Sequence, residues 1–447
     1  MPSAIFTIGR TGLTASRLSL ELTAQNIANG ANPDYSRRSL TQNELVMTGA
    51  IGISASADSL GGIRPGVVVR AESALVQRQA RDTSSALAAA QAEFFALREA
   101  ESALETSGLF TGLVEFEAAL TRLEGNPLEP ALRLSAVESA RQMAGNFRIA
   151  DGTLANARSL VQDEAAAEVL NVNELAAELA KVNRDLVAAR EGTAGRAALL
   201  DARDQALRGL SEQFGMVTAI NADGTADVTL DAAPQVALVA GGTAASVSLG
   251  FAADGTLAFD IGGTAFAPAS GAMAGRATAL AEMAGLQSGI DSLAASVIAI
   301  ANGAQGAGVD ADGNPGQPLF SGTRAGDIDV ALTSATGLAT AGSGAPAGSR
   351  DTANLAALLG ALGAETGPAA DADAMLLGLS SRVSALDTRR EGLSVVAASA
   401  EAELLRETGV DLDTEAANLV RLQQAFEANS RVIQVATELF DTLLGLR

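Results

Sequence analysis

The sequence predicts a mainly α-helical, elongated protein whose N- and C-terminal helices pair as a coiled coil. An elongated helical shaft domain follows this pair, and a small β domain is inserted into the shaft. Three observations predict this class. Apolar residues recur at helical spacing at both extreme ends of the 447-residue chain. Long helical patterns fill most of the interior, and only residues 216–270 change to strand character.

The C-terminal stretch, residues 409–447, is predicted to form one long amphipathic helix. Its apolar residues are three and four positions apart, which makes a narrow seam rather than a broad core face. At about 1.5 Å per residue such a helix is about 50 Å long, so at the end of a chain it needs a partner. Ala416 and Ala436 lie on this seam. The residues that we expect at a subunit interface are Leu412, Leu419, Leu422, Phe426, Asn429, Ile433, Phe440 and Leu443.

The N-terminal stretch, residues 3–29, is the predicted partner, with Ser3 as the expected N-cap and Gly30 just past the end. Alone it would also suit a globular core, but seam-bearing helices at both ends favour a coiled pair. An isolated helix gains little from burial, so we expect the termini to be poorly ordered until they meet a partner. A stripe at seven-residue spacing consists of Phe6, Leu13, Leu20 and Ile27. The expected interface residues are Ile5, Ile8, Leu13, Leu20, Leu22, Asn26, Ile27, Asn29 and Tyr35.

Three asparagines on these helices, Asn26, Asn29 and Asn429, have two interpretations. An asparagine in an apolar seam lowers stability and can fix the register between two helices. A solvent-facing or capping role fits each position equally well. The sequence leaves both interpretations open.

Gly, Pro and Asn signals divide the interior into helices and turns. Helices are predicted over residues 71–106, 111–124, 130–190 (with a break considered near Gly152), 199–214, 276–302, 351–362 and 371–408. Residues 216–230 and 247–261 are predicted hairpins, each turning at an Asp-Gly pair. Residues 40–69 are expected to be a loop with short strands, and 303–349 a loop. The predicted domains are a terminal coiled-coil assembly domain (1–48 plus 395–447), a helical shaft domain (70–215 plus 275–394) and an inserted small β domain (216–270).

Composition excludes several classes of site and partner. The chain has no His and no Cys, which removes Ser-His-Asp catalysis, imidazole or thiolate metal ligands and disulfides. Its net charge is −22, most of it between the two ends, which argues against nucleic acid and membrane as partners. Charged residues interrupt any apolar region of a signal peptide near the N-terminus, so we expect secretion, if any, without a cleaved signal. The best membrane candidate, residues 286–301, contains Asp291 and is too short to span a bilayer.

Candidate chemical sites are weak, so we predict no catalytic residues, no metal and no cofactor. Asp310, Asp312 and Asn314 resemble part of a calcium loop, but the Gly position and the final Glu do not fit. Lys181, the single lysine, suits a surface ion pair. Asp201, Arg203 and Asp204 share a helical face, which explains their clustering without catalysis. An enzyme with its site in residues 216–350 is therefore the least favoured class.

Short motifs mark both ends of the chain and parts of its interior. The N-terminal motifs are Gly12-Leu13-Thr14-Ala15, Asn26-Ile27-Ala28-Asn29 and Asn32-Pro33-Asp34-Tyr35-Ser36-Arg37. The C-terminal and interior motifs are residues 409–415, 423–429, 440–444, 126–140, 199–205 and 316–321. The motifs at both ends resemble those of the flagellar axial proteins, the family of rod, hook and hook-associated proteins. The C-terminal and interior motifs resemble the hook-associated members at the hook-filament junction. Within that family, Asp34 stands where Gly is usual and Arg38 where Gln is common.

The resemblance implies a structural, non-enzymatic part of the bacterial flagellum that joins hook to filament by helical co-assembly of its termini. Its implied partners are further copies of itself in a ring or tube, the hook subunit, the filament-side junction protein and a cytoplasmic export chaperone at the C-terminal helix. The implied location is extracellular, after export through the flagellar secretion channel. The alternatives are another axial protein, such as the hook subunit or the filament-side junction protein, and a cytoplasmic coiled-coil dimer with ordered termini.

Overall fold

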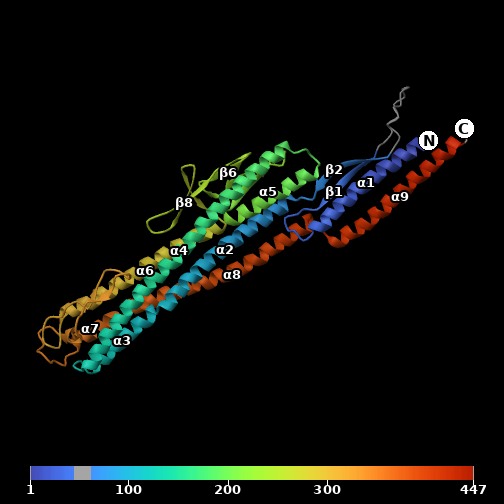
Figure 1. The fold of residues 1–447 in the computed structure, drawn as a ribbon. Coiled ribbons are helices and arrows are strands. Elements are labelled where there is room, and N and C mark those ends of the chain that lie inside the picture. The colour runs from blue at the N-terminus through green and yellow to red at the C-terminus, as the bar shows by residue number, and fades with distance from the viewer. Residues whose placement is uncertain (1, 45–61, 446–447) are drawn as a thin grey trace.

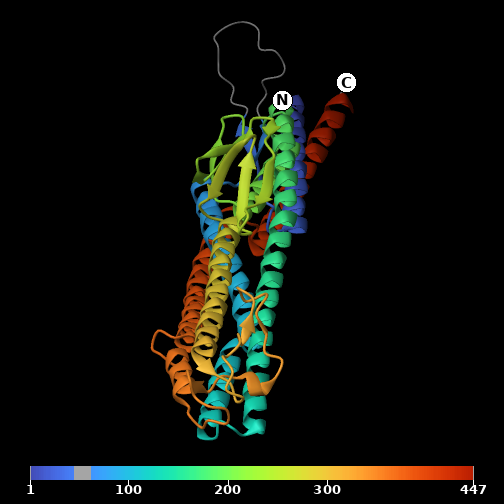
Figure 2. The ribbon, with the colours of Figure 1, turned by 90° about the vertical axis from the view of Figure 1, so that its left-hand side faces the viewer.

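A computed structural model describes residues 2–44 and 62–445 and shows a long, slender molecule (Figure 1). Both termini lie at one end of it, and the long helices run from there to the opposite end (Figure 1). The strands between residues 216 and 268 form one lateral bulge beside the helices (Figure 2). The predicted mainly α-helical class is confirmed.

The terminal region contains α1 (Pro2–Asn29), α9 (Leu412–Gly445) and a two-stranded ribbon of β1 (Arg38–Glu44) and β2 (Ile63–Arg70). The two helices lie side by side in one chain, as the predicted coiled pair requires. Each helix supplies the other with the partner that an isolated helix lacks. Helix α1 already includes Ser3, so this residue is not the N-cap. The ribbon forms the ends of the expected loop, whose residues 45–61 lie outside the described part.

The shaft is a bundle of long helices in which the longest element, α4, runs unbroken for 59 residues. We considered a break at Gly152, where a glycine costs about 1 kcal/mol. Ala150 and Leu154 on either side are fully buried, and their packing offsets that cost. Helix α5 begins five residues before the predicted start, because Thr193 caps it by accepting a hydrogen bond from the Arg196 amide at 3.2 Å. The shaft helices are α2 (Ala74–Ser107), α3 (Leu109–Gly125), α4 (Pro130–Ala188), α5 (Ala194–Gln213), α6 (Ala272–Ala307), α7 (Ala353–Leu362) and α8 (Pro368–Thr408).

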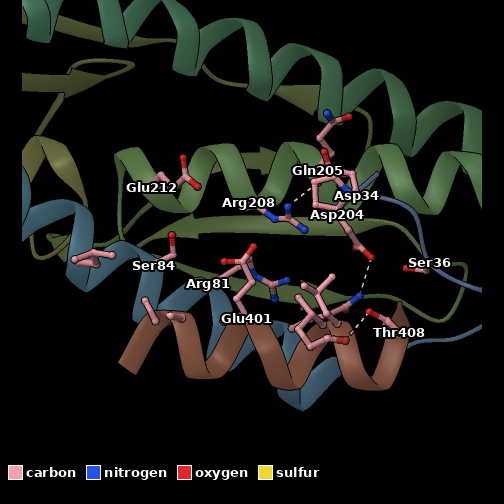
Figure 3. A pocket seen from close by; sticks show the side chains of 18 of the residues that line it. Asp34, Ser36, Arg81, Ser84, Asp204, Gln205, Arg208, Glu212, Glu401 and Thr408 are labelled. Carbon is pink, nitrogen blue, oxygen red and sulfur yellow. Dashed lines mark hydrogen bonds and ion pairs between the residues drawn. The ribbon is translucent and has the colours of Figure 1, made fainter. Parts of the chain in front are cut away.

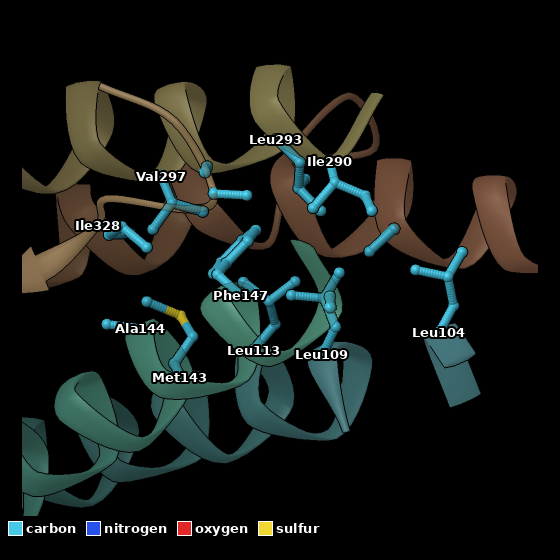
Figure 4. Packing of buried hydrophobic residues seen from close by; sticks show 14 of the residues in the cluster. Leu104, Leu109, Leu113, Met143, Ala144, Phe147, Ile290, Leu293, Val297 and Ile328 are labelled. Atoms are coloured by element: carbon cyan, nitrogen blue, oxygen red, sulfur yellow. The ribbon is translucent and has the colours of Figure 1, made fainter. Parts of the chain in front are cut away.

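Leucine, isoleucine, valine, phenylalanine, methionine and alanine side chains form the main core of the shaft (Figure 4). Phe147 on α4 and Leu113 on α3 are almost completely buried, and Val297 on α6 packs into the same cluster. Alanines such as Ala144 let the helices approach closely, and larger side chains fill the remaining space at high density. Among the described residues, α1 and α9 contribute none to this core, which therefore stabilises the shaft by itself.

The β region consists of two four-stranded antiparallel sheets, with strand orders β3-β4-β6-β7 and β5-β10-β9-β8. The two predicted hairpins match β3–β4 and β8–β9, with the same strand boundaries. In their turns Asp223 and Asp254 each accept two hydrogen bonds from the threonine two residues later, one from its hydroxyl at 2.7 Å and one from its amide at 3.0 Å. These bonds, the hydroxyl bond first, hold the pKa of both carboxyls below the usual value. The strands are β3 (Met216–Ile220), β4 (Ala226–Leu230), β5 (Ala232–Ala233), β6 (Val236–Ala240), β7 (Thr243–Ala244), β8 (Val247–Phe251), β9 (Leu257–Ile261) and β10 (Thr264–Pro268).

A second hydrophobic cluster joins these sheets to α4 and α5. Phe214, at the end of α5, contacts Phe259 and Phe266 with ring centroids 5.6 and 5.9 Å away. The sheets are therefore packed onto the shaft along one face and present their other face to solvent (Figure 2).

The segment between α6 and α7 is more ordered than the loop that we expected. The buried Arg133 organises it by donating to the carbonyl oxygens of Pro127 at 2.6 Å and Leu338 at 2.8 Å and to the Thr340 hydroxyl at 2.9 Å. Leu338 and Thr340 are 205 and 207 positions from Arg133 in the sequence, so no local sequence pattern reveals these two contacts. The short elements are β11 (Gly308–Val309), β12 (Phe320–Ser321), β13 (Asp329–Val330), η1 (Ala335–Gly337) and β14 (Ala341–Gly342).

Helix α6 is long and apolar enough, by length and composition, to cross a membrane. This corrects the expectation that the apolar stretch at 286–301 is too short, because the helix extends well beyond it on both sides. Met283, Ile290 and Val297 on this helix are fully buried in the shaft core. A core helix of a bundle has the same composition, so α6 is weak grounds for a membrane segment.

Candidate assembly surface

The inner faces of α1 and α9 meet through small residues. A Cβ atom added to Gly9 would lie 2.8 Å from Cγ1 of Ile433, and one added to Gly12 would lie 2.6 Å from Oδ1 of Asn429. Both distances are shorter than real contacts, so the Ile433 and Asn429 side chains would have to shift to admit a methyl group at either glycine. Asn429 also donates to the Ser16 hydroxyl across the seam, at 3.4 Å.

The middle of the predicted α9 seam faces α1, and its two ends do not. Ala436 is buried, whereas Leu412, Ala416 and Phe440 are exposed, and Glu415 is buried in place of Ala416. Leu412 is exposed over part of its surface and borders Gly30. The side chain of Leu443 lies outside the described part of the chain. The half-buried predicted residues of this helix are Leu419, Leu422, Phe426, Asn429 and Ile433.

The predicted stripe of α1 faces away from the centre of this seam. Leu22 is the predicted apolar residue that is buried, together with Ala15 beside the stripe. Helix α1 uses Gly9, Gly12 and Ser16 for its inner face, so its bulky residues are displaced outwards. Leu13, Leu20 and Ile27 are half-buried, and Ile5, Phe6 and Ile8 are exposed.

The outer surface of the terminal pair therefore carries large apolar side chains. Phe6 is 44% exposed and Phe440 is 54% exposed, at the ends of α1 and α9 nearest the termini. An apolar group on this surface gains roughly 25 cal/mol for each Å² that a partner covers. The further exposed apolar residues of α9 are Val420, Val432, Val435 and Leu439.

The three asparagines have different roles in the structure. Asn26 is buried and holds the turn after α1: its amide donates to the carbonyl oxygen of Arg38 at 2.8 Å, and its carbonyl accepts from the Tyr35 hydroxyl at 2.8 Å. Asn29 donates to a carbonyl of its own helix, at Gln25. Asn429 lies in the seam between the helices, so it is the asparagine of the three that fits a role in register.

Tyr35, predicted at a subunit interface, is buried inside the chain. Besides its bond to Asn26, its ring lies under the guanidinium of Arg38, 4.7 Å from the ring centroid. Burial raises the pKa of Tyr35, the Arg38 charge acts against this, and the charges of Asp201 and Glu415 add to it. Its neighbour Asp34 needs no positive φ and forms an ion pair with Arg208 of α5 at 2.7 Å.

The base of the terminal region is fixed to α5 by a cluster of buried charges. Asp201 accepts hydrogen bonds from Arg38 and Arg70, and Asp204 accepts one from Arg70, all at 2.6 Å. Arg203 donates to Asp204 at 2.9 Å. Burial acts to lower the pKa of Arg70, but the Asp204 and Asp201 charges outweigh it and raise that pKa. The sequence predicted that Asp201, Arg203 and Asp204 share one helical face. It did not predict that Arg38 and Arg70, more than 100 positions away, bind the two carboxylates.

A cavity of about 260 Å³, lined by both charged and apolar side chains, lies beside this cluster, between α2, α5, α8 and the turn after α1 (Figure 3). The side chains of Arg81, Arg208, Glu212 and Glu401 line it. Burial lowers the pKa of Arg81 and raises that of Glu212, and the Arg208 charge opposes the shift of Glu212. Acids and bases mix around the cavity, so no nucleophile, base and orienting group converge there.

The other chemical candidates are structural or solvent-exposed. Asp310 uses its carboxylate to accept hydrogen bonds from the amides of Asp312 at 2.9 Å and Asn314 at 2.8 Å, which closes a turn. Lys181 is exposed on α4. Within residues 2–44 and 62–445, acidic side chains do not gather into a group that could hold a metal ion.

Family models match two parts of the chain. The model of the "Flagellar hook-associated protein FlgK helical domain" matches residues 97–320, about half of the chain. The model "Flagellar basal body rod FlgEFG protein C-terminal" matches residues 403–446, which include α9. The two matches therefore cover the shaft and the C-terminal helix separately.

Individual proteins give the same similarity. Flagellar hook-associated protein 1 of Escherichia coli (strain K12) is 24% identical over 234 residues, covering 51% of this chain and 42% of the relative. The protein of that name from Bacillus subtilis (strain 168) is 25% identical over 221 residues, covering 48% of this chain and 44% of the relative. The chain thus spans less than half the length of the curated relatives it matches.

The fold is also similar to that of a solved structure. The flagellar hook junction protein FlgK from Burkholderia pseudomallei superimposes with a TM-score of 0.63 at 13% identity. The match covers 72% of this chain and 98% of the other. At this identity the likeness concerns the fold alone.

Proposed function

The chain belongs to the flagellar hook-associated protein family defined by the FlgK helical domain, and from this membership we propose that it is a structural component of the bacterial flagellum that forms the junction between hook and filament. The junction would form by co-assembly of the terminal helices of neighbouring subunits. The helical shaft would form the wall of the assembly, with the β sheets directed to solvent.

The observation that carries this proposal is the exposed apolar surface of the terminal pair. A helix pair of a monomeric protein normally buries its large apolar side chains, and contiguous exposed patches mark interaction sites. Here the inner seam is closed by small residues, and Phe6, Val435 and Leu439 remain on the outside. The predicted interface residues that are exposed, Ile5, Ile8, Leu412 and Phe440, belong to this assembly surface. The half-buried ones contribute only the part of their surface that the partner helix leaves uncovered. Leu22, Asn26 and Tyr35 instead stabilise it from within the chain.

The proposed partners follow from that role. They are further copies of the chain in a ring or tube, the hook subunit on one side and the filament-side junction protein on the other. We also propose export through the flagellar channel without a cleaved signal peptide. A cytoplasmic export chaperone would cover α9 beforehand, because an exposed apolar seam invites premature association. We assign the chain no catalytic step, cofactor, nucleic-acid partner or membrane.

Deletion of the gene in its own bacterium tests the junction role. We expect normal hooks without filaments in electron micrographs, and filaments restored by the parent sequence. Absent hooks would instead favour the second candidate, a rod or hook subunit. The match of residues 403–446 to a rod-protein model supports that candidate. A discrete soluble dimer in the cytoplasm would favour the coiled-coil alternative.

A peptide tag in the turn at Gly262 and Gly263, between β9 and β10, locates the protein directly. A side chain added at either glycine would meet nothing within 4 Å, so the tag has room. We expect antibody label only at the boundary between hook and filament. Label along the whole hook or the whole filament would contradict the proposal.

A further inference from the structure

The terminal region and the shaft are joined by polar contacts, without a shared apolar core. Neither hydrophobic cluster contains a described residue from 2–44, 62–73 or 401–445. The main chain contributes hydrogen bonds from the Arg37 amide to the Thr408 carbonyl at 2.8 Å and from the Val68 amide to the Gly192 carbonyl at 2.9 Å. The cavity described above, with Arg81, Arg208 and Glu401 in its lining, lies at the same boundary. The relative position of the two regions therefore depends on polar groups.

Two pairs of charges match across this boundary. Arg38 and Arg70 are directly opposite each other in the β1–β2 ribbon. Two arginines at such a position repel one another unless anions lie between them. Asp201 and Asp204 are three residues apart on α5, which places them on one face of that helix. The carboxylates therefore meet both guanidinium groups, and Asp201 bridges them.

The cluster is largely shielded from water. The Arg70 side chain is 4% exposed and the Asp201 side chain is 13% exposed. Loss of one partner would leave a buried, uncompensated charge, which is far more costly than loss of a surface ion pair. Planar guanidinium groups also fix direction, because their N–H donors have a rigid geometry.

The cluster is connected to the terminal pair by one further step. The carbonyl oxygen of Arg38 accepts the hydrogen bond from the buried Asn26 near the end of α1, and the Arg38 amide donates to the Asn26 side chain at 3.1 Å. Asn26 thus links the ribbon, which is bound to α5, to the turn that follows α1. Arg208 adds a less buried contact from α5 to Asp34 in the same turn.

We propose that Asp201 and Asp204 are positioning residues: through Arg38 and Arg70 they fix the direction of the terminal helix pair relative to the shaft. This inference rests on the proposed function only for the use of the terminal pair in assembly. The geometric claim concerns the isolated chain. In an assembly, a fixed direction would present the same apolar surface to every neighbouring subunit.

Distances between spin labels test the claim, because the chain has no native cysteine. One label is placed at Thr14→Cys on α1 and one at Ser102→Cys on α2, both exposed positions. We expect a narrow distance distribution in the parent chain and a broad one after Asp201→Asn with Asp204→Asn. Labels at Ser102→Cys and Ser292→Cys, both in the shaft, should keep their narrow distribution in the same variant. Asp163→Asn, an exposed acid on α4, is the matched control and should change neither pair.

A broad terminal distribution in the parent chain, or a narrow one that survives both substitutions, would overturn the inference. The double variant could also broaden the distance distribution of the two shaft labels. In that case Arg38→Lys is the deciding variant, because it keeps the positive charge and loses the planar guanidinium group. We expect Arg38→Lys to broaden the distribution between the labels on α1 and α2 and to leave the distribution within the shaft narrow, and an unchanged α1–α2 distribution would count against the proposal.

Hydrogen exchange of the ribbon gives a second readout. Loss of a buried partner should speed exchange in residues 38–44 and 63–70 by about 100-fold or more, with β3 and β4 unchanged. Equal acceleration in both regions would show general destabilisation and contradict a positioning role. Both measurements are made on the isolated chain and do not depend on flagellar assembly. A negative result would therefore contradict the positioning role without contradicting the junction role.

Discussion

The shaft and the terminal pair use apolar residues in opposite ways. In the shaft, Phe116, Phe147 and Leu154 are almost completely buried, and alanines fill the closest helix contacts. In the terminal pair the closest contacts involve Gly9 and Gly12, while Phe6 and Phe440 remain exposed. The difference indicates that the shaft has the core of a stable unit, whereas the terminal pair keeps its apolar groups available for a partner.

Truncation of one phenylalanine in each region should show the largest difference in stability between the shaft and the terminal pair. Phe147→Ala in the shaft should lower the free energy of unfolding by about 3–5 kcal/mol, because it leaves a cavity in a fully packed core. Phe440→Ala should change it by less than about 0.5 kcal/mol in the isolated chain. Urea unfolding followed by circular dichroism measures both values. Equal losses would show that the terminal pair is part of the same cooperative core.

Removal of Arg133 should destabilise the far end of the shaft. Arg133→Leu leaves the carbonyl oxygens of Pro127 and Leu338 without their donors, so we expect a loss of about 2–3 kcal/mol. Faster hydrogen exchange should be confined to the segment between α6 and α7. Arg141→Leu is the control, because Arg141 is an exposed residue of the same helix that pairs with Glu138. An effect of Arg141→Leu as large as that of Arg133→Leu would contradict the role of burial.

A methyl group at the closest contact of the terminal pair should separate its helices. Gly12→Ala would place Cβ 2.6 Å from Asn429, so we expect a local loss of about 1–2 kcal/mol and faster hydrogen exchange in α1 and α9. Gly145→Ala in α4 is the matched control, since a Cβ there meets nothing within 4 Å. That change should stabilise the shaft by up to about 1 kcal/mol. Unchanged exchange in the Gly12→Ala variant would contradict the close approach.

The smallest expected effect is the titration of Tyr35, the single tyrosine of the chain. Burial raises the pKa of Tyr35 in the folded state above the value of about 10 in an unfolded chain. The folded state therefore holds the proton more tightly, and this stabilisation is complete below pH ~10 and is lost as pH rises through the folded pKa. Ultraviolet absorbance should give a midpoint above that of the same chain in urea. Identical midpoints would mean that the turn holding Tyr35 is open.

Periodicity predicted the elements well because it is a local property of the sequence. The helices of the shaft, the hairpins β3–β4 and β8–β9 and the middle of the α9 seam follow from spacing and turn residues alone. Helix α1 differs, because the heptad stripe of bulky residues suggested its inner face. The inner face is formed by Gly9, Gly12 and Ser16, since small residues permit the closest packing.

Contacts between distant residues could not be predicted from the sequence. The pairing of Arg38 with Asp201 spans 163 positions, and Arg133 bonds to carbonyls more than 200 positions away. Every residue has a main-chain carbonyl, so the sequence does not show which one accepts a hydrogen bond. The chain also has many acidic residues, so the sequence does not show which carboxylate pairs with a given arginine. The resemblance to flagellar axial proteins supplied the family, but it did not show how the terminal region is attached to the shaft.

The division between a self-sufficient shaft and an outward-facing terminal pair is tested most directly by counting filaments on hooks. Phe6→Ser, Val435→Ser and Leu439→Ser together remove exposed apolar groups of the terminal pair, and Leu134→Ser, Ile149→Ser and Leu170→Ser remove exposed apolar groups of the shaft. Each triple variant replaces the parent in the deletion strain, and the melting temperature of the purified chain is measured alongside. We expect both to fold like the parent, with bare hooks for the terminal variant and filaments for the shaft variant. Filaments at the parent frequency in the terminal variant would contradict the account.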